Sequence, residues 1–172
     1  KAVANNLNDI SKDHADIAIA VAARWAKDQN PLTGWIIKQG CRTLVKQGNK
    51  EIFPILGFDH RPKVKVGKFL VSPARLPIGA GTTLTCSLKS HASSQQKLII
   101  DYRVTFCRAG GKTASKVFKW SVKPLTGGGT LTLSTRHKFA DGTTRKHFPG
   151  RHAFTLLING VEMASAHCTL AR

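Results

Sequence analysis

Acidic residues are scarce in this chain of 172 residues, above all in its second part. The whole sequence has 9 Asp and Glu against 27 Lys and Arg, a formal net charge of +18. Residues 1–60 hold 8 basic and 6 acidic side chains, which leaves 19 basic and 3 acidic for residues 61–172, a net charge of +16. No fold requires so large a surplus, because like charges repel. A polyanionic partner, most often nucleic acid, is the ordinary reason for it, and the change near residue 60 is a candidate domain boundary.

Further absences exclude whole classes of protein. No apolar run approaches the roughly 18 residues that a membrane-spanning helix needs, and no signal peptide is visible after Lys1. A charged fraction of 21% is ordinary and the hydrophobic fraction is 41%, a composition that disfavours a disordered chain. There is no CxxC pair and no zinc-ligand spacing among the histidines, so we expect no metal site and free thiols in a reducing cytosol. The cysteines are Cys41, Cys86, Cys107 and Cys168.

Residues 1–58 carry apolar side chains at the i, i+4, i+7 spacing that is typical of helices. Asn30-Pro31 separates the second set from the third, and Gly48 ends the third. We expect a short helix over roughly residues 50–56 to close the segment. The three sets are Val3, Leu7 and Ile10; Ile17, Val21 and Trp25; and Ile37, Cys41 and Leu44.

The first and third helices repeat each other with a constant offset of 34 residues, from Val3–Lys12 to Ile37–Lys46. Such a period suggests stacked helical hairpins of the HEAT or TPR type. Solenoid repeats bury their faces only against neighbours, and about three are needed for stability. Because at most two are present and the first helix has no cap, we expect a longer solenoid that has been cut or that lies N-terminal to Lys1.

Residues 63–171 alternate apolar and polar side chains, as strands do. Asn159-Gly160 predicts a two-residue hairpin turn, since both positions need φ > 0. About seven short strands predict an immunoglobulin-type β-sandwich without its usual disulfide between the sheets, and Arg61-Pro62 is the expected linker. Six of these strands are placed by the pattern, around residues 84–88, 97–107, 118–122, 131–133, 154–158 and 166–170.

The predicted fold class is therefore α+β in separate domains. Residues 1–60 are expected to be the C-terminal end of a HEAT-like α-α solenoid. Residues 61–172 are expected to be a strongly basic, antiparallel, immunoglobulin-like β-sandwich.

Motifs spread over nearly the whole chain resemble one bacterial family. The helical part resembles the last repeat of the AlkC branch of alkylation-repair DNA glycosylases, and the sandwich resembles the C-terminal immunoglobulin-like domain of one AlkC subgroup. The motifs that carry the resemblance are residues 3–14 (VANNLNDISKDH), 35–38 (WIIK), 42–44 (RTL), 56–58 (LGF), 101–102 (DY), 111–112 (GK), 116–119 (KVFK), 143–147 (TTRKH), 149–152 (PGRH) and 159–160 (NG).

The chain also departs from the family's expected pattern. We expect His-Ala-Leu where it has Gln39-Gly40-Cys41, Arg where it has Gly34, and Pro where it has Ala15. Gly40 inside a helix costs about 1 kcal/mol relative to Ala. The position of Gln39 is a candidate to face DNA, so this departure puts a family contact in doubt.

The resemblance implies a solenoid whose concave face holds duplex DNA containing alkylated bases. Family members release cationic methylated bases, 3-methyladenine above all, by hydrolysing the N-glycosidic bond. Because such a base is already a good leaving group, carboxylate and aromatic groups need only stabilise the developing oxocarbenium charge. No metal or organic cofactor is implied, and we expect a cytoplasmic, nucleoid-associated monomer. The main catalytic carboxylates should lie upstream of Lys1, so this chain alone should be inactive.

Two groups of side chains are candidates for DNA contact. On the helices, Lys38, Arg42 and Lys46 recur every four residues, which predicts either a phosphate-binding stripe or a solvated face. On the sandwich, residues 145–147 and 151–152 bracket a turn, so that one loop edge could present both, and scattered solubilising charge is the alternative. The full set is Asn5, Asn8, Lys12, Trp35, Lys38, Arg42, Lys46, Lys116, Lys119, Arg136, Arg145, Lys146, Arg151 and His152.

Asp9 is a weak candidate for a catalytic carboxylate, because such residues more often cap helices or stay solvated. Trp35 is open for stacking on a base, whereas Trp25 and Trp120 lie on apolar faces that favour core packing. Two other functions stay open: a non-enzymatic module that binds nucleic acid or an acidic protein, and a secreted adhesion-type sandwich, which the four unpaired cysteines disfavour.

Overall fold

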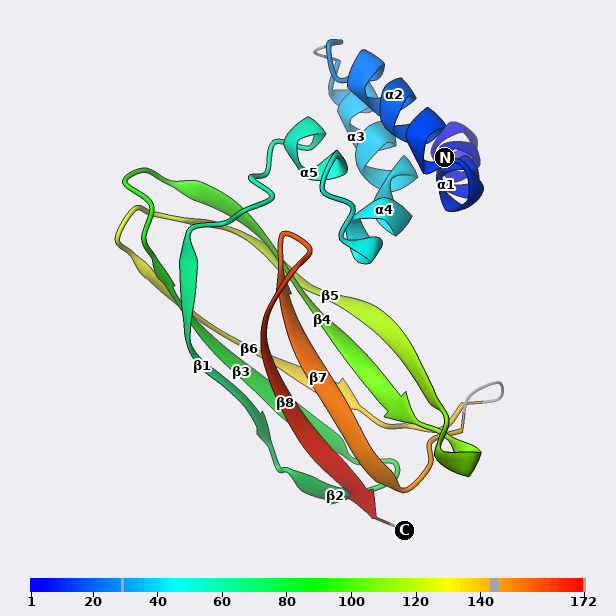
Figure 1. Cartoon of the computed structure of the whole chain (residues 1–172), viewed down its shortest axis with the longest axis vertical. Coiled ribbons are helices and arrows are strands. Elements are labelled where there is room, and N and C mark those ends of the chain that lie inside the picture. The colour runs from blue at the N-terminus through cyan, green and yellow to red at the C-terminus, as the bar shows by residue number, and fades with distance from the viewer. Residues whose placement is uncertain (29, 143–145, 172) are drawn as a thin grey trace. The chain divides into compact units, whose positions relative to one another are not determined.

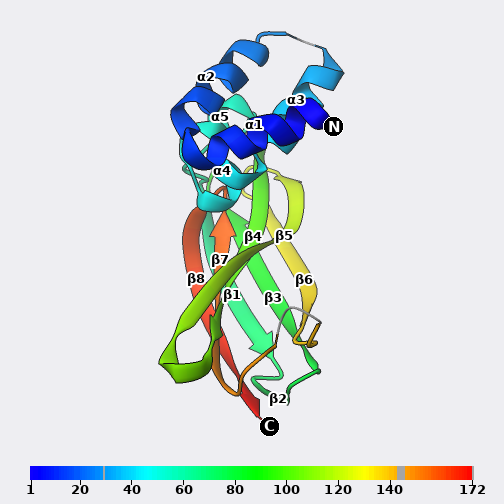
Figure 2. The ribbon, with the colours of Figure 1, turned by 90° about the vertical axis from the view of Figure 1, so that its right-hand side faces the viewer.

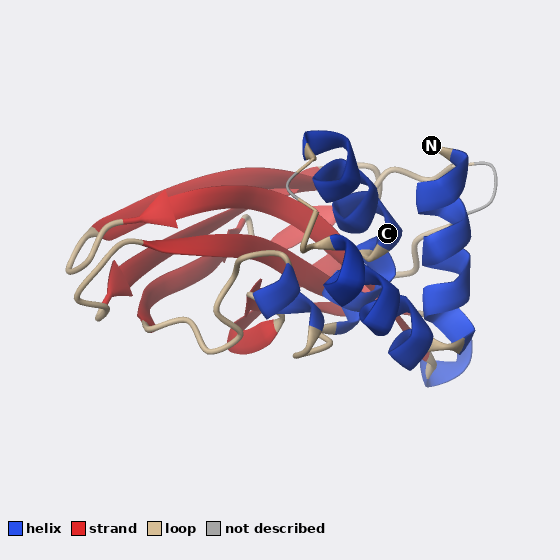
Figure 3. Cartoon of the chain, turned by 90° about the horizontal axis from the view of Figure 1, so that it is seen from above, coloured by secondary structure: helices blue, strands red, loops and turns tan. Residues whose placement is uncertain are grey.

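Two units make up the structure, which is a computed structural model describing residues 1–28, 30–142 and 146–171. The first unit comprises Lys1–Pro62 together with Asn159–Val161, and the second comprises Lys63–Ile158 with Glu162–Arg172. Helices and strands separate along the described part of the sequence, since α1 to α5 precede β1 (Figure 1). Figure 3 colours the helices blue and the strands red. The prediction of helices followed by β-sheets is confirmed.

Five α-helices form the first unit: α1 (Ala2–Asp13), α2 (Ala15–Trp25), α3 (Pro31–Gly40), α4 (Arg42–Gln47) and α5 (Ile52–Ile55). Asn30 begins α3 because its Oδ1 accepts a hydrogen bond from the Leu32 amide at 2.9 Å, with Pro31 at the first helical position. Gly48, in the left-handed region at φ 72°, ends α4.

One helix prediction was wrong. The third predicted helix is two helices, because the backbone leaves helical geometry at Cys41 (φ −99°, ψ 12°). Gly40 lies just before this break, and a Cβ added there would be 2.7 Å from Cδ2 of Leu7. The glycine therefore lets α1 and α3 approach closely, which offsets its low helix propensity.

Helix α2 contributes smaller side chains to the core of the first unit than the apolar spacing predicts. Ala18 and Ala22 are fully buried on α2, whereas Val3 and Ile17 are 53% and 49% exposed. No helix among the described residues is both long and apolar enough to cross a membrane.

Two antiparallel layers form the second unit (Figure 2). A three-stranded sheet has the order β1 (Val64–Ser72), β3 (Gly81–Ser90), β6 (Thr130–Lys138). The five-stranded sheet has the order β2 (Arg75–Pro77), β8 (Val161–Ala171), β7 (Gly150–Ile158), β4 (Gln96–Cys107), β5 (Thr113–Leu125). β1 with β3, β3 with β6, β4 with β5 and β4 with β7 are antiparallel pairs, whereas β2 pairs with β8 in parallel.

The described residues contain eight strands, where the sequence predicted about seven. The unassigned strands are β1 and β2. A register shift between Val66 and Lys68 breaks the alternation of β1, and β2 has only three residues. The predicted turn at Asn159-Gly160 is present, with φ values of 48° and 78°.

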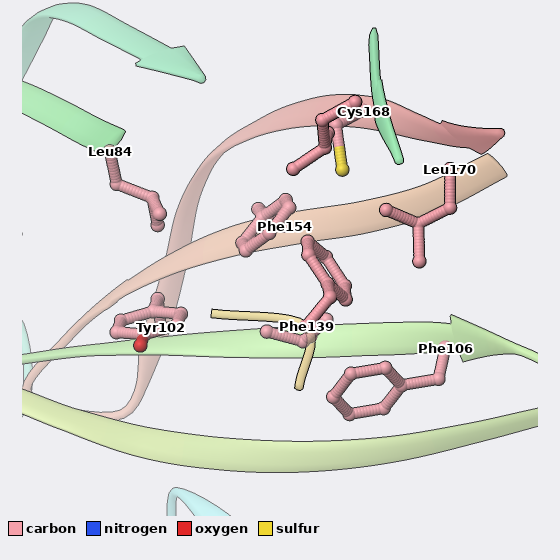
Figure 4. Close-up of a cluster of buried hydrophobic side chains, with 9 residues drawn as sticks. Leu84, Tyr102, Phe106, Phe139, Phe154, Cys168 and Leu170 are labelled. Atoms are coloured by element: carbon pink, nitrogen blue, oxygen red, sulfur yellow. The ribbon is translucent and has the colours of Figure 1, made fainter. Parts of the chain in front are cut away.

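Aromatic and aliphatic side chains from both sheets fill the space between the layers (Figure 4). Leu84 of β3 meets Tyr102 of β4 and Phe154 of β7 in one buried cluster. Trp120 packs against this cluster and against its neighbour, as expected for a core residue. The sandwich needs no disulfide, and all four cysteines are free thiols.

Candidate nucleic-acid interface

A polar pocket of about 340 Å³ opens on the helical unit, where α1, α3 and α4 converge. Three of the side chains predicted to contact DNA line it, namely Asn5, Trp35 and Arg42. Trp35 is 43% exposed, so part of this residue is open to solvent, as stacking on a base requires. Lys1, Ala4 and Gln39 complete the lining.

Arg42 is held in this pocket by two hydrogen bonds. Its Nη1 donates to the carbonyl oxygen of Gln39 at 2.6 Å, and its Nη2 donates to Oδ1 of Asn5 at 3.3 Å. A guanidinium has five N–H donors, so this arrangement orients the group between α1 and α3 and leaves donors for an anionic ligand.

The predicted stripe of Lys38, Arg42 and Lys46 is divided between two helices, because α3 ends at Gly40 and α4 begins at Arg42. Lys38 and Lys46 are exposed and do not line the pocket. The structure thus groups Arg42 with Trp35 and Asn5 rather than with the two lysines.

Asn8 is a structural residue, so its assignment as a DNA contact was wrong. Its side chain is 3% exposed, and its Oδ1 accepts hydrogen bonds from the amide of Thr43 at 3.3 Å and from the Thr43 hydroxyl at 2.9 Å. Asn8 therefore joins α1 to the first turn of α4, beside the pocket.

Asp9 and Lys12 form an exposed ion pair, with Nζ and Oδ1 2.7 Å apart. The hydrogen bond from Lys12, and then its charge, lower the pKa of the Asp9 carboxyl, with a smaller contribution from the charge of Arg42. Asp9 is therefore an ionised carboxylate near neutral pH, able to stabilise positive charge but not to donate a proton. Asp9 is exposed, whereas catalytic carboxylates are usually desolvated in part by burial.

The sandwich candidates do not share one surface. Arg136 lies on the outer face of the three-stranded sheet, where a Cβ added to Gly81 would be 2.7 Å from its Nε. Lys119 belongs to the other sheet, directly across from Asp101 of β4. Lys116, Lys146 and Arg151 are exposed, and Arg145 lies outside the described residues.

His152 is buried, so its assignment as a DNA contact was wrong. Its Nδ1 accepts a hydrogen bond from the Cys107 amide at 3.3 Å, and its Nε2 donates to the carbonyl oxygen of Phe148 at 3.0 Å. Burial lowers the pKa of this imidazole, so that it is neutral near pH 7. His137 and His147 are also buried, among Phe106 and Phe139.

The sequence pattern could have predicted the burial of His137 and His152. His137 and Phe139 stand two residues apart, as do His152 and Phe154, so in a strand each histidine shares the inward face with its aromatic neighbour. Cys41, Cys86 and Cys168 are also unreactive, because burial raises the pKa of each thiol to about 11. Among the described residues, no group of three or more His, Cys, Asp or Glu could hold a metal ion.

Four exposed lysines that the sequence analysis did not single out lie on the outer face of the three-stranded sheet with Arg136. They are Lys65, Lys68, Lys89 and Lys138. Their place on one face depends on strand register, which the sequence alone did not provide.

Comparison with known proteins gives consistent relatives. Residues 65–172 match the family described as "Uncharacterised protein YhaZ, C-terminal Ig-like domain". Protein YhaZ of Bacillus subtilis (strain 168) is 37% identical over 160 residues, which cover 93% of this chain and 44% of YhaZ. The alkylpurine DNA glycosylase AlkC of Pseudomonas fluorescens, solved bound to DNA containing an abasic site analog, superposes with a TM-score of 0.91 at 35% identity.

The AlkC match covers 98% of this chain and 47% of the glycosylase, so the chain spans about half the length of these relatives. A β-glucosidase of Listeria innocua also matches, with a TM-score of 0.52 and 13% identity over 65% of this chain and 16% of the enzyme. At that identity the similarity concerns the fold alone.

Proposed function

Because the chain belongs to the AlkC-type family, with the immunoglobulin-like domain typical of YhaZ, we propose that it is the DNA-holding portion of a glycosylase for alkylated bases. The observation that carries the proposal is the superposition of 98% of the chain on a glycosylase bound to DNA. The surplus of 19 basic over 3 acidic side chains in residues 61–172 supports the same partner.

The helical unit is proposed to be the end of a HEAT-like solenoid. The contact of Gly40 with Leu7 relates α1 to α3, the two helices that share the 34-residue offset. The exposed Val3 and Ile17 provide the kind of apolar surface that one repeat presents to its neighbour.

Within that solenoid, the pocket residues are proposed to hold the damaged strand. Arg42 would donate to a phosphate oxygen, and Trp35 would stack on an unpaired base or sugar. Both groups suit a site near an extruded nucleotide, because neither requires a particular base.

The proposed chemistry is hydrolysis of the N-glycosidic bond of a cationic, 3-methyladenine-like base, without metal or cofactor. The positive charge of the lesion weakens the bond, so the protein's part is to stabilise the sugar cation and admit water. Asp9 is the nearest ionised carboxylate to this pocket in sequence, but the side chains described around the pocket include none. We place the main catalytic carboxylates in the half of the relatives that this chain does not cover.

A second candidate function is a nucleic-acid-binding module without catalysis. The polar, carboxylate-free lining of the pocket favours it for the chain by itself. An acidic protein partner or a secreted adhesion role has no comparable observation in its favour.

Base release from methylated duplex DNA tests the proposal. The chain alone should bind the duplex without releasing 3-methyladenine, whereas a fusion that supplies the other half of the relatives should release it. A fusion that binds DNA and never releases a base would contradict the glycosylase and leave the binding module. Robust release by the 172-residue chain would place the active site here, with Asp9→Asn as the first variant to make.

A further inference from the structure

The outer face of the three-stranded sheet has an unusual composition. We call it the hydroxyl face. Seven of its side chains carry hydroxyl groups, five carry positive charge, and β1, β3 and β6 contain no acidic residue at all. The hydroxyl residues are Ser72, Thr83, Thr85, Ser87, Thr130, Thr132 and Ser134, and the cations are Lys65, Lys68, Lys89, Arg136 and Lys138.

Register and burial fix the direction of these side chains. Their neighbours Val66, Phe69 and Leu131 pack into the core, so alternation places the hydroxyl residues outside. Thr85 pairs with Ser134, and Ser87 pairs with Thr132, across β3 and β6. Small side chains therefore stand opposite one another along the middle of the face.

Two glycines leave room for neighbouring side chains on the hydroxyl face. A Cβ at Gly67 would be 2.9 Å from Oγ of Ser87, and a Cβ at Gly81 would be 2.7 Å from Nε of Arg136. Gly67 thus leaves room for the serine hydroxyl, and Gly81 lets the arginine lie across the sheet. Among the described residues of this face, one large apolar side chain is exposed, that of Leu70, at 49%.

This chemistry fits a row of phosphates. Phosphate oxygens in protein–DNA complexes accept hydrogen bonds from Ser and Thr hydroxyls as well as from Lys and Arg. The three strands are nine, ten and nine residues long. At a spacing of about 4.8 Å they make a face roughly 10 Å wide and 30 Å long, close to one turn of duplex. An acidic protein partner would normally need several apolar anchors at the centre of the interface, and Leu70 is a single one.

We propose that the hydroxyl face binds the phosphate backbone of duplex DNA without reading its sequence. The proposal rests on the proposed function for its partner, and it adds the surface that makes the contact. The described residues of this face are all strand residues, with no helix to enter a groove, so the proposed contact is with the backbone alone.

The salt dependence of duplex binding tests the surface. The triple change Lys65→Gln, Lys68→Gln and Lys89→Gln removes three charges from the hydroxyl face. The matched control Arg75→Gln, Lys112→Gln and Lys123→Gln removes three exposed charges from the other sheet, on β2, at the residue before β5 and on β5. Since each contacted phosphate contributes about 0.9 to the slope of log K against log salt, the face variant should lower the slope by about 2.7 and the control should leave it unchanged. Equal slopes in the two variants would overturn the proposal.

The hydroxyl groups allow a second test that does not alter charge. Thr83→Val, Thr85→Val and Thr132→Val keep the shape and strand preference of each side chain but remove its hydroxyl. Affinity for duplex DNA should fall about tenfold at every salt concentration while the slope stays the same, because lost hydrogen bonds release no counterions. Unchanged affinity in this folded variant would contradict direct phosphate contact.

The experiments distinguish a wrong assignment of the binding surface from a wrong proposed function. If the unaltered chain binds no duplex DNA at low salt, that result would contradict both the proposed function and this inference. If the unaltered chain binds duplex DNA and the face variant binds it equally well, only the assignment of the hydroxyl face as the binding surface would be wrong. Binding of polyglutamate as tightly as duplex DNA of equal charge would overturn DNA as the partner of this face.

Discussion

The helical unit and the sandwich carry positive charge in different ways. Residues 1–60 have a net charge of +2, and their cations include Lys12, paired with Asp9, and Arg42, held by Asn5 and Gln39. Residues 61–172 have a net charge of +16 with only three acidic side chains. The helical unit thus positions a few groups around a pocket, whereas the sandwich offers many cations.

The two sheets of the sandwich differ in whether acidic residues lie beside their cations. Glu162 of β8 pairs with Arg103 of β4, with Oε1 and Nη2 2.5 Å apart, and Asp101 lies across from Lys119. Both acidic residues belong to the five-stranded sheet, so the three strands of the hydroxyl face have no acidic residue to offset their cations. We propose that the position of these two acidic residues, more than the net charge, decides where a polyanion binds.

The largest expected effect comes from making the hydroxyl face resemble the other sheet. Thr85→Glu with Thr132→Glu places two carboxylates among its cations, and duplex affinity at low salt should fall by about a hundredfold because both repel phosphate. Thr113→Glu with Ser115→Glu on β5 is the control and should cost less than about threefold. Fluorescence anisotropy with labelled duplex measures both, and equal losses would mean that only net charge matters.

The buried His152 should make the sandwich sensitive to acid. Its folded-state pKa is lowered, so the unfolded chain binds a proton first, and stability that is present above about pH 6.5 is lost as pH falls below it. His152→Gln retains an acceptor for the Cys107 amide but does not titrate. The variant should be less stable at pH 8 by about 1–2 kcal/mol, and the difference should shrink toward pH 5. Urea unfolding at both pH values measures this, and a constant difference would contradict it.

Trp35 should contribute affinity without salt dependence, in contrast to the lysines of the sandwich. Trp35→Ala should weaken binding to a duplex with an abasic site about tenfold, because stacking on one base contributes about 1–3 kcal/mol. Its slope of log K against log salt should equal that of the unaltered chain. Equal affinity for the variant would mean that the pocket does not meet DNA.

The smallest effects concern two glycines of α3 in different surroundings. A Cβ added at Gly34 would have no atom within 4 Å, so Gly34→Ala should stabilise the helical unit by about 0.5–1 kcal/mol. Gly40→Ala gains the same propensity but forces its Cβ against Leu7, so it should destabilise by about 1 kcal/mol or more. Thermal unfolding of the two variants should shift in opposite directions, and a shared upward shift would show that α1 and α3 separate easily.

The sequence predicted the parts of the fold that depend on local pattern. The change of apolar period from 3.6 to 2 separated helices from strands, and Asn159-Gly160 predicted its turn. The failures involve partners that are distant in sequence. Asn8 is buried through Thr43, 35 residues away, and His152 through Cys107, 45 residues away.

The candidate site was predictable only in part for the same reason. Asn5, Trp35 and Arg42 were identified and do line one pocket. The cations of the hydroxyl face were mostly missed, because their common surface follows from the pairing of β1, β3 and β6. A count of charges along the chain contains no information about which sheet each strand joins.

Backbone amide chemical shifts, followed on titration with duplex DNA, show which surface the DNA contacts. Shifts at the strands of the hydroxyl face, such as at Thr85 and Ser134, should change together with those at Trp35 and Arg42 of the pocket. The outer positions of β4 and β5, such as Thr105 and Ser115, should change little. Changes concentrated on β4 and β5, with the hydroxyl face unaffected, would mean that DNA binds the five-stranded sheet and that the hydroxyl face is not its binding surface.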